Sequence, residues 1–424
     1  MITKRMELCH GVWLNMIQTD RFKTGYFSFN LLRQLDEKTA SVNALIPSVL
    51  LRGSREYPDI QSISQQLDLL YGASVGSLIR KEGEVQTIGL SADFLEDRYV
   101  NGEPVFAQMM ELIRSLLFHP CMEDGGFCEE YVAGEKQNLV NTILSRINDK
   151  RSYAIARLLK HMCAGERFGV PRLGEIEPLE AVNGKMLYLW WQELLATSRI
   201  EVFYLGQQSV DTVLEQMRQL IACLPERADL VRVQTTPVQQ TRSVQCVEES
   251  MNVTQGKLTM GFRTPITAHD ARYPALMMMN AVFGAGMTSK LFMKIREEQS
   301  LCYYASSSLV RTKGMMLVTS GIEFDQYETA KNGILEQLEL CKAGQITKEE
   351  LEGARNYLMS GLRTYHDSQG QMDDFAISQA IAGLDFTIPD LIGKLENVTL
   401  QEVIEAANTL TLDTIYFLKG VDAV

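Results

Sequence analysis

The run LIRKEG at Leu78–Gly83 returns as LVRTKG at Leu309–Gly314, at an offset of 231 residues. Alternating apolar residues flank both runs, and the glycine that ends each run is typical of a β-hairpin turn. At the same offset Gly53, which ends one helical pattern, corresponds to Gly284, which ends another. A pattern that recurs at one spacing indicates an internal duplication, so the sequence predicts two similar halves.

The two halves also predict the same order of elements. Alternating strand patterns at 25–32 and 257–263 come first, and helices, a hairpin and longer helices follow. Each half closes on a β-rich run that reaches glycine, at Ile200–Gly206 and at Thr414–Gly420. These patterns favour an α+β fold made of two duplicated sandwiches, each an antiparallel sheet covered by helices.

The length of 424 residues is enough for two or three domains. We place an N-terminal domain at 1–225, a linker at 226–249 and a C-terminal domain at 250–424. The predicted linker is polar, contains Pro237 and has a centre rich in threonine and glutamine, which is typical of a connecting segment.

Composition narrows the class of protein. Apolar residues make up 46% of the chain and charged residues 22%, which is ordinary for a globular protein. The net charge of −12 argues against binding to nucleic acid or to an anionic membrane surface. No apolar run approaches the roughly 18 residues of a membrane span, so no membrane insertion is expected. The 8 cysteines form no C-x-x-C pair, and together with the lack of a signal-peptide pattern they predict a cytoplasmic protein with reduced thiols.

A longer motif lies in the C-terminal half. The segment YPAL at 273–276 is followed by FGAGMTSKLF at 283–292, IREE at 295–298 and LCY at 301–303. This segment resembles the C-terminal half of the M16 metallopeptidases, the relatives of pitrilysin and mitochondrial processing peptidase that are also called inverzincins. Segments of the first half are similar to that family as well, so the resemblance covers nearly the whole chain and implies M16-type sandwiches.

The family's zinc site is missing from this sequence. That site is H-x-x-E-H on a helix, with two histidine ligands, a glutamate that activates water and a distant glutamate as third ligand. The resemblance places these four functions at Ala44, Pro47, Ser48 and Thr142. Their side chains cannot hold Zn²⁺, which binds imidazole, thiolate or carboxylate. We therefore expect no catalytic residue, metal or cofactor in this chain, and zinc in a partner chain only.

Other candidate ligands do not replace that site. No two of the five histidines are four residues apart; they are His10, His119, His161, His269 and His366. Glu135 is retained seven residues before Thr142, and alone on a polar helix face it is expected to be a solvated carboxylate.

A second functional pair of the family is present. The resemblance implies that Arg296 and Tyr303 contact the peptide substrate, and a guanidinium and a phenol can both donate hydrogen bonds to a peptide carbonyl. Gly284 and Gly286 would let the backbone approach that peptide without a side chain in the way. Two alternatives stay open: Arg296 as an exposed partner of a neighbouring glutamate, and Tyr304 as the functional tyrosine.

The resemblance supports one leading hypothesis for function. Some family members are heterodimers in which one chain carries H-x-x-E-H and the other the arginine and tyrosine. We expect a non-catalytic, substrate-positioning subunit that works with an M16 homologue carrying H-x-x-E-H on a peptide substrate. The alternative is a wholly inactive scaffold or assembly protein with the same fold, and an autonomous metallopeptidase with unrecognised ligands ranks last.

Overall fold

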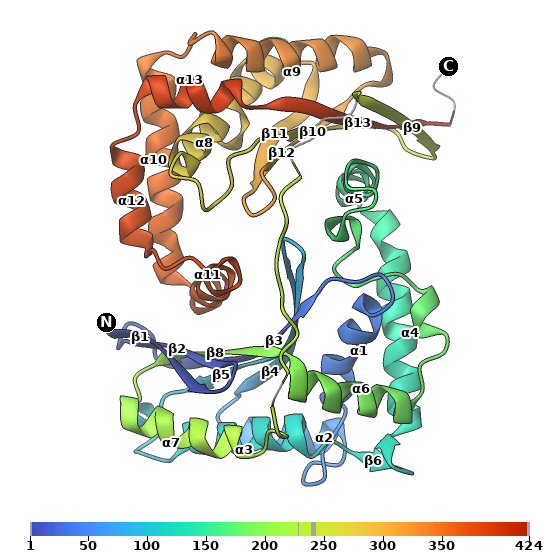
Figure 1. The fold of residues 1–424 in the computed structure, drawn as a ribbon, viewed down its shortest axis with the longest axis vertical. Coiled ribbons are helices and arrows are strands. Elements are labelled where there is room, and N and C mark those ends of the chain that lie inside the picture. The colour runs from blue at the N-terminus through green and yellow to red at the C-terminus, as the bar shows by residue number, and fades with distance from the viewer. Residues whose placement is uncertain (1, 228, 239–242, 422–424) are drawn as a thin grey trace. The chain divides into compact units, whose positions relative to one another are not determined.

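The computed structural model describes residues 2–227, 229–238 and 243–421. Its contacts divide the chain into two compact units (Figure 1). The first unit comprises Met1–Leu144, Val170–Gln234 and Gln369–Ile381, and the second comprises Ser145–Gly169, Thr235–Ser368 and Ala382–Val424. Each unit therefore includes a segment from the other half of the sequence. The domain boundaries at 1–225, 226–249 and 250–424 stay a prediction.

The first unit is built on a six-stranded sheet in the order β1-β2-β8-β3-β5-β4. Its strands are β1 (Ile2–Cys9), β2 (Val12–Gln18), β3 (Thr24–Gln34), β4 (Ser74–Glu82), β5 (Val85–Leu95) and β8 (Arg199–Gly206). All neighbouring strands are antiparallel except β2 and β8, which are parallel. The N-terminal sheet is thus mixed at one pair, where the sequence predicts an antiparallel sheet.

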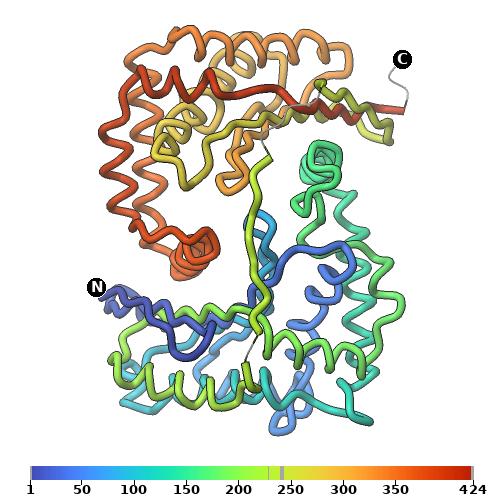
Figure 2. The backbone as a smooth tube through the Cα atoms, viewed as in Figure 1, coloured from blue at the N-terminus to red at the C-terminus, as the bar shows by residue number. Residues whose placement is uncertain are grey.

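Helices cover both faces of this sheet (Figure 1). One face is covered by helices that include α1 (Ala40–Leu50), α3 (Val105–Phe118), α6 (Gly184–Thr197) and α7 (Val210–Ile221). The unit also contains α2 (Ile60–Leu69) and α4 (Glu129–Ser145). On the other face lies α11 (Gln369–Ala382), whose Met372 and Ile377 pack on Tyr26 and Phe203. Figure 2 shows this segment, distant in sequence, next to the strands of the first sheet. Because side chains alternate along a strand, Phe27 points to the opposite core.

The second unit repeats this plan with five strands in the order β11-β12-β10-β13-β9. The strands are β9 (Gln245–Met251), β10 (Gly256–Arg263), β11 (Cys302–Val310), β12 (Met315–Ile322) and β13 (Thr411–Gly420). Its own helices are α8 (Tyr273–Asn280), α9 (Tyr327–Lys342), α10 (Lys348–Thr364), α12 (Ile388–Glu396) and α13 (Leu400–Asn408). The opposite face is covered by α5 (Lys150–Met162), which comes from the first half of the sequence (Figure 1).

The order of strands establishes the duplication. The series β2-β8-β3-β5-β4 corresponds position by position to β9-β13-β10-β12-β11, and the single parallel pair recurs as β13 with β9. Gly83 and Gly314 turn the equivalent hairpins with φ of 57° and 63°, a conformation that favours glycine. The predicted fold of two α+β sandwiches is confirmed. In the described part of the chain, no helix is both long and apolar enough to span a membrane.

Candidate functional site

The predicted pair Arg296 and Tyr303 lines one cavity of about 390 Å³ in the second unit. Arg296 lies near the end of a π-helix, Leu291–Glu298, and Tyr303 lies near the start of β11. The other lining residues are Glu297, Ser300, Leu301, Cys302, Glu323 and Gln326. Helix and strand thus bring the two hydrogen-bond donors to one concave site, although six residues separate them in the sequence.

A β-bulge sets the direction of Tyr303. In the pairing of β11 with β12, Cys302 lies opposite Ile322 and Tyr304 lies opposite Gly321, so Tyr303 is the additional residue. A bulge re-aims the side chain that it carries, and bulges are common beside binding sites. Tyr303 is 61% exposed, which leaves its phenol accessible from the cavity.

The two donors of this cavity, Tyr303 and Arg296, differ in how firmly they are held by their present partners. The Tyr303 hydroxyl donates to Glu323 Oε1 at 2.5 Å, and this hydrogen bond raises the pKa of Tyr303, so the phenol stays a protonated donor. Arg296 is only loosely engaged. Its Nε is 3.5 Å from Glu297 Oε1, and its guanidinium carbon is 4.7 Å from the centre of the Phe292 ring. Arg296 therefore has N–H groups to offer to a ligand.

The neighbouring tyrosine has different surroundings. Tyr304 returns to the strand register opposite Gly321, and its half-buried ring lies against Arg151 and Lys257. Tyr304 does not line the Arg296 cavity. The geometry therefore places Tyr303, and not Tyr304, with Arg296. The role of either tyrosine in substrate binding stays a prediction.

The two glycines of the motif lie in a packed region. A Cβ atom on Gly284 would stand 2.6 Å from Ser307 Oγ and 2.7 Å from Leu291 Cδ1. The absence of a side chain therefore lets the π-helix Ala281–Ala285, which contains Gly284, approach β11. At Gly286 the nearest atoms belong to the Tyr357 ring, at 3.4 Å. Close packing explains Gly284 within the fold, while contact of either glycine with a peptide stays a prediction.

The positions of the zinc site do not fit a metal ion. Ala44 and Pro47 are buried in α1, and Ser48 lies beside them on the same helix. Thr142 in α4 is exposed, and its hydroxyl donates to the Asn138 carbonyl oxygen at 2.8 Å. None of these four side chains carries a nitrogen, sulfur or carboxylate ligand. In the described ranges, no three residues of the types His, Cys, Asp and Glu gather as a metal site would require.

Glu135 differs from its expected solvated state. Arg52 Nη1 lies 3.1 Å from Glu135 Oε1, and Asn138 donates to the other oxygen at 3.3 Å. The Glu135 side chain is only 14% exposed, and the Arg52 guanidinium also lies over the Tyr131 ring at 5.1 Å. The retained carboxylate is therefore neutralised by an arginine 83 residues away, which no local pattern could reveal.

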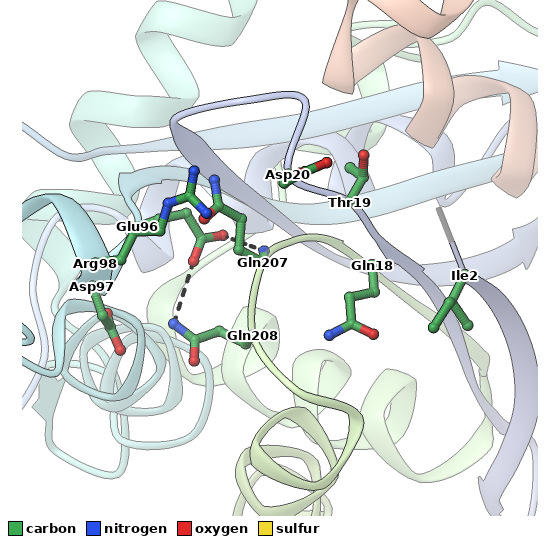
Figure 3. Close-up of a pocket in the computed structure, with 9 residues that line it drawn as sticks. All are labelled: Ile2, Gln18, Thr19, Asp20, Glu96, Asp97, Arg98, Gln207 and Gln208. Atoms are coloured by element: carbon green, nitrogen blue, oxygen red, sulfur yellow. Dashed lines mark hydrogen bonds between the residues drawn. The ribbon is translucent and has the colours of Figure 1, made fainter.

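A further polar cavity of about 460 Å³ lies in the first unit, and the sequence did not predict it (Figure 3). Its lining includes Glu96, which follows β5, and Gln207 and Gln208, which follow β8. The buried Glu96 carboxylate accepts from Gln207 N at 2.8 Å and from Gln208 Nε2 at 3.3 Å, which ties the two strand ends together. Burial raises the pKa of Glu96. The internal repeat is the signal that could have revealed this cavity. Glu96 directly follows β5, and Glu323, which lines the Arg296 cavity, directly follows the equivalent strand β12.

Comparison with known proteins agrees with these observations. A family model described as "Peptidase M16 inactive domain" matches residues 181–358. The chain is 30% identical over 413 residues to the "Probable inactive metalloprotease YmfF" of Bacillus subtilis (strain 168), covering 97% of this chain and 96% of that protein. It is 23% identical over 298 residues to the "Uncharacterized zinc protease YmxG" of the same organism, covering 69% of this chain and 70% of that one.

Solved structures give the same fold. A conserved protein from Enterococcus faecalis V583 has a TM-score of 0.90 and 28% identity, covering 99% of this chain and 98% of that one. A peptidase M16 inactive domain from Pseudomonas fluorescens has a TM-score of 0.80 at 14% identity, with 99% of each chain covered. With the duplicated sandwiches and the zinc-site positions described above, these likenesses show that the chain belongs to the M16 peptidase family, as a member that lacks the H-x-x-E-H zinc motif.

Proposed function

We propose that this chain is the non-catalytic, substrate-positioning subunit of a heterodimeric M16-type zinc metallopeptidase that processes peptides or short protein segments. One observation carries the proposal: Arg296 and an exposed Tyr303 line the same cavity, whereas the zinc-site positions have lost every ligand. A partner chain with H-x-x-E-H would supply the zinc and its activated water.

The chemistry of the pair suits an extended peptide. The Arg296 guanidinium and the Tyr303 hydroxyl are both donors, and a peptide carbonyl is an acceptor. Negative charge builds on that oxygen when water attacks the carbonyl, so donors held in place would stabilise the developing oxyanion. Tyr303 would exchange its hydrogen bond to Glu323 for one to the peptide, which its exposed position permits. Glu323 would then be the acceptor that keeps the phenol in position before a peptide binds.

Co-purification from the native cell tests whether such a pair exists. The chain, tagged and expressed at its natural level, is expected to bring down a protein of similar size that carries H-x-x-E-H, and the pair is expected to cleave unstructured peptides. The purified chain alone is expected to hold substoichiometric zinc and to cleave none of them. A stable complex whose other members all lack H-x-x-E-H would replace this proposal with the scaffold alternative. Stoichiometric zinc in the chain alone, with chelator-sensitive activity, would favour an autonomous metallopeptidase.

A further inference from the structure

A polar cluster occupies the α5-covered face of the second unit's sheet. Arg151, in the first turn of α5, donates to Ser306 Oγ at 3.0 Å and to Thr319 Oγ1 at 3.3 Å. Its guanidinium carbon lies 4.4 Å from the centre of the Tyr304 ring, and Lys257 Nζ lies 5.7 Å from the same centre. Two cations therefore border one aromatic ring.

The register of the sheet builds this cluster. Gly321 on β12 lies opposite Lys257 of β10 on one side and opposite Tyr304 of β11 on the other. A Cβ atom at Gly321 would stand 2.5 Å from Tyr304 Cε1, so only glycine lets the ring lean across β12 toward Lys257. Two residues along each strand, the hydroxyls of Ser306 and Thr319 lie 3.2 Å apart on the same face. The arrangement thus rests on three rigid strands and one helix.

The charge of the cluster is unbalanced. In the part of the chain that the structure describes, the side-chain partners of Arg151 and Lys257 are neutral: two hydroxyls for Arg151 and the Gln255 amide oxygen for Lys257. The carboxylate of Asp149 interacts electrostatically with both Lys257 and Arg151, so one carboxylate faces two cations. Asp149 caps α5 and already accepts from two backbone N–H groups at 3.1 Å and from the Ser152 hydroxyl.

Two buried cations of the same unit differ from the exposed Arg151 and the half-buried Lys257 in having a carboxylate partner. Arg263 and Lys313 each have a carboxylate oxygen of Glu166 at 2.7 Å, as expected for charges withdrawn from water. Burial, and then the nearby Arg151, hold the pKa of Lys257 below its usual value, so its charge is disfavoured where it stands. An anion at this position would relieve that cost. Arg151 is exposed and Tyr304 and Ser306 are half-buried, whereas Thr319 is buried, so the cluster is open to a ligand from the side of Arg151.

We propose that Arg151 and Lys257, with the hydroxyls of Ser306 and Thr319, form a binding site for a carboxylate of a peptide, either its C-terminus or an acidic side chain. The guanidinium offers paired N–H groups that match the two oxygens of a carboxylate, and the ammonium adds a second charge. This inference deepens the proposed function, on which the peptide nature of the ligand rests, by naming a carboxylate-bearing peptide as the ligand.

Calorimetric titration of the full chain without a partner tests the site. The probes are an unstructured decapeptide of neutral side chains with a free C-terminus, the same peptide amidated, the amidated peptide with one central aspartate, and inorganic phosphate, all at low salt. We expect the free-acid or the aspartate peptide to bind more tightly than the amidated neutral one. Arg151→Gln and Lys257→Gln are each expected to weaken that binding about tenfold or more, the loss typical of a charge-assisted hydrogen bond.

Two matched variants complete the experiment. Lys348→Gln removes one exposed positive charge elsewhere in the unit and is expected to leave the affinity for the peptides unchanged. Lys257→Arg keeps the positive charge and is expected to retain binding. Equal binding of all peptides, equal binding by the wild type and both glutamine variants, or a site that takes phosphate but no peptide carboxylate would overturn the proposal. The assay contains no partner and measures no turnover. Loss of carboxylate binding is therefore compatible with an active peptidase pair, and carboxylate binding is compatible with an inactive one.

Discussion

At the scale of single residues, the ion pair of Arg52 with Glu135 connects the segments that carry the zinc-site positions in the first unit. Glu135 lies on α4, seven residues before the third-ligand position, and Arg52 lies two residues after the end of α1, the helix that carries the other three positions. An ion pair at 3.1 Å joins the segment after α1 to α4. A positive side chain held at that carboxylate also opposes the approach of a cation, because like charges repel.

The Arg52–Glu135 pair should contribute measurably to stability. Its side chains are 29% and 14% exposed, so we expect Arg52→Gln to lower the free energy of unfolding by about 1–2 kcal/mol, between the values for exposed and buried pairs. Glu135→Gln should cost less, because the amide oxygen can still accept from Arg52. Urea denaturation measures both. The matched control is Lys294→Gln, which breaks an exposed pair with Glu298 (2.7 Å) and should cost about 0.5 kcal/mol or less. Equal losses for Arg52→Gln and the control would refute the assignment.

At the scale of elements, the two hairpins and the two exchanged helices define the fold. The hairpin between β11 and β12 presents Tyr303 and Tyr304 on its first strand, and α5 attaches to the same sheet through hydrogen bonds to Glu249. Burial acts to raise the pKa of Glu249, but donors from Tyr153, Tyr416 and Arg157 outweigh it and hold the pKa below its ordinary value.

Gly314 should be intolerant of a side chain. Its φ is 63°, and a Cβ atom would stand 2.3 Å from the Thr264 carbonyl oxygen, so Gly314→Ala should cost about 1–3 kcal/mol or more. Gly361 in α10 is the control, because no atom lies within 4 Å of its would-be Cβ. There alanine should stabilise the helix by about 0.5–1 kcal/mol. The thermal unfolding midpoint should therefore fall for Gly314→Ala and rise for Gly361→Ala; an unchanged or raised midpoint for Gly314→Ala would show that the hairpin does not require glycine.

The stability contributed by Glu249 should depend on pH with a defined sign. Its carboxylate accepts from Tyr153, Arg157 and Tyr416 at 2.7, 2.9 and 2.8 Å. Because its pKa is depressed in the folded state, its contribution is present above pH 4.5, its ordinary value, and is lost as pH falls through the folded-state value. Glu249→Gln should thus cost about 1–2 kcal/mol at pH 7, and the difference from wild type should shrink below pH 4.5. A difference that is constant from pH 7 to pH 3 would contradict the role of the ionised carboxylate.

At the scale of the whole molecule, the duplication was predictable and the exchange between its halves was not. The repeat around Gly83 and Gly314 predicts equivalent hairpins, and the strand order confirms them. The amphipathic pattern of α5 shows that one of its faces is apolar, but not which sheet will cover that face, and α11 has hardly any such pattern to read. The sequence likewise shows that Arg296 and Tyr303 are present, but it does not show the one-residue bulge that aims Tyr303. The register of a strand depends on partner strands that are distant in sequence. The Arg52–Glu135 pair was missed on the same ground.

The proposed function depends on the pair Arg296 and Tyr303, and turnover of the reconstituted heterodimer tests it most directly. With the H-x-x-E-H partner held constant, Arg296→Ala and Tyr303→Phe should each lower turnover by roughly 10²–10³, the loss found for a comparable oxyanion donor, while folding and pairing persist. Tyr71→Phe is a matched control, since Tyr71 is also exposed and donates to a glutamate, Glu103, at 2.8 Å. Arg272→Ala, at an exposed arginine paired with Asp270, is the other. Both controls should leave turnover unchanged. If Arg296→Ala and Tyr303→Phe were as silent as these controls in an active pair, the substrate-positioning role would be contradicted and the scaffold alternative would stand.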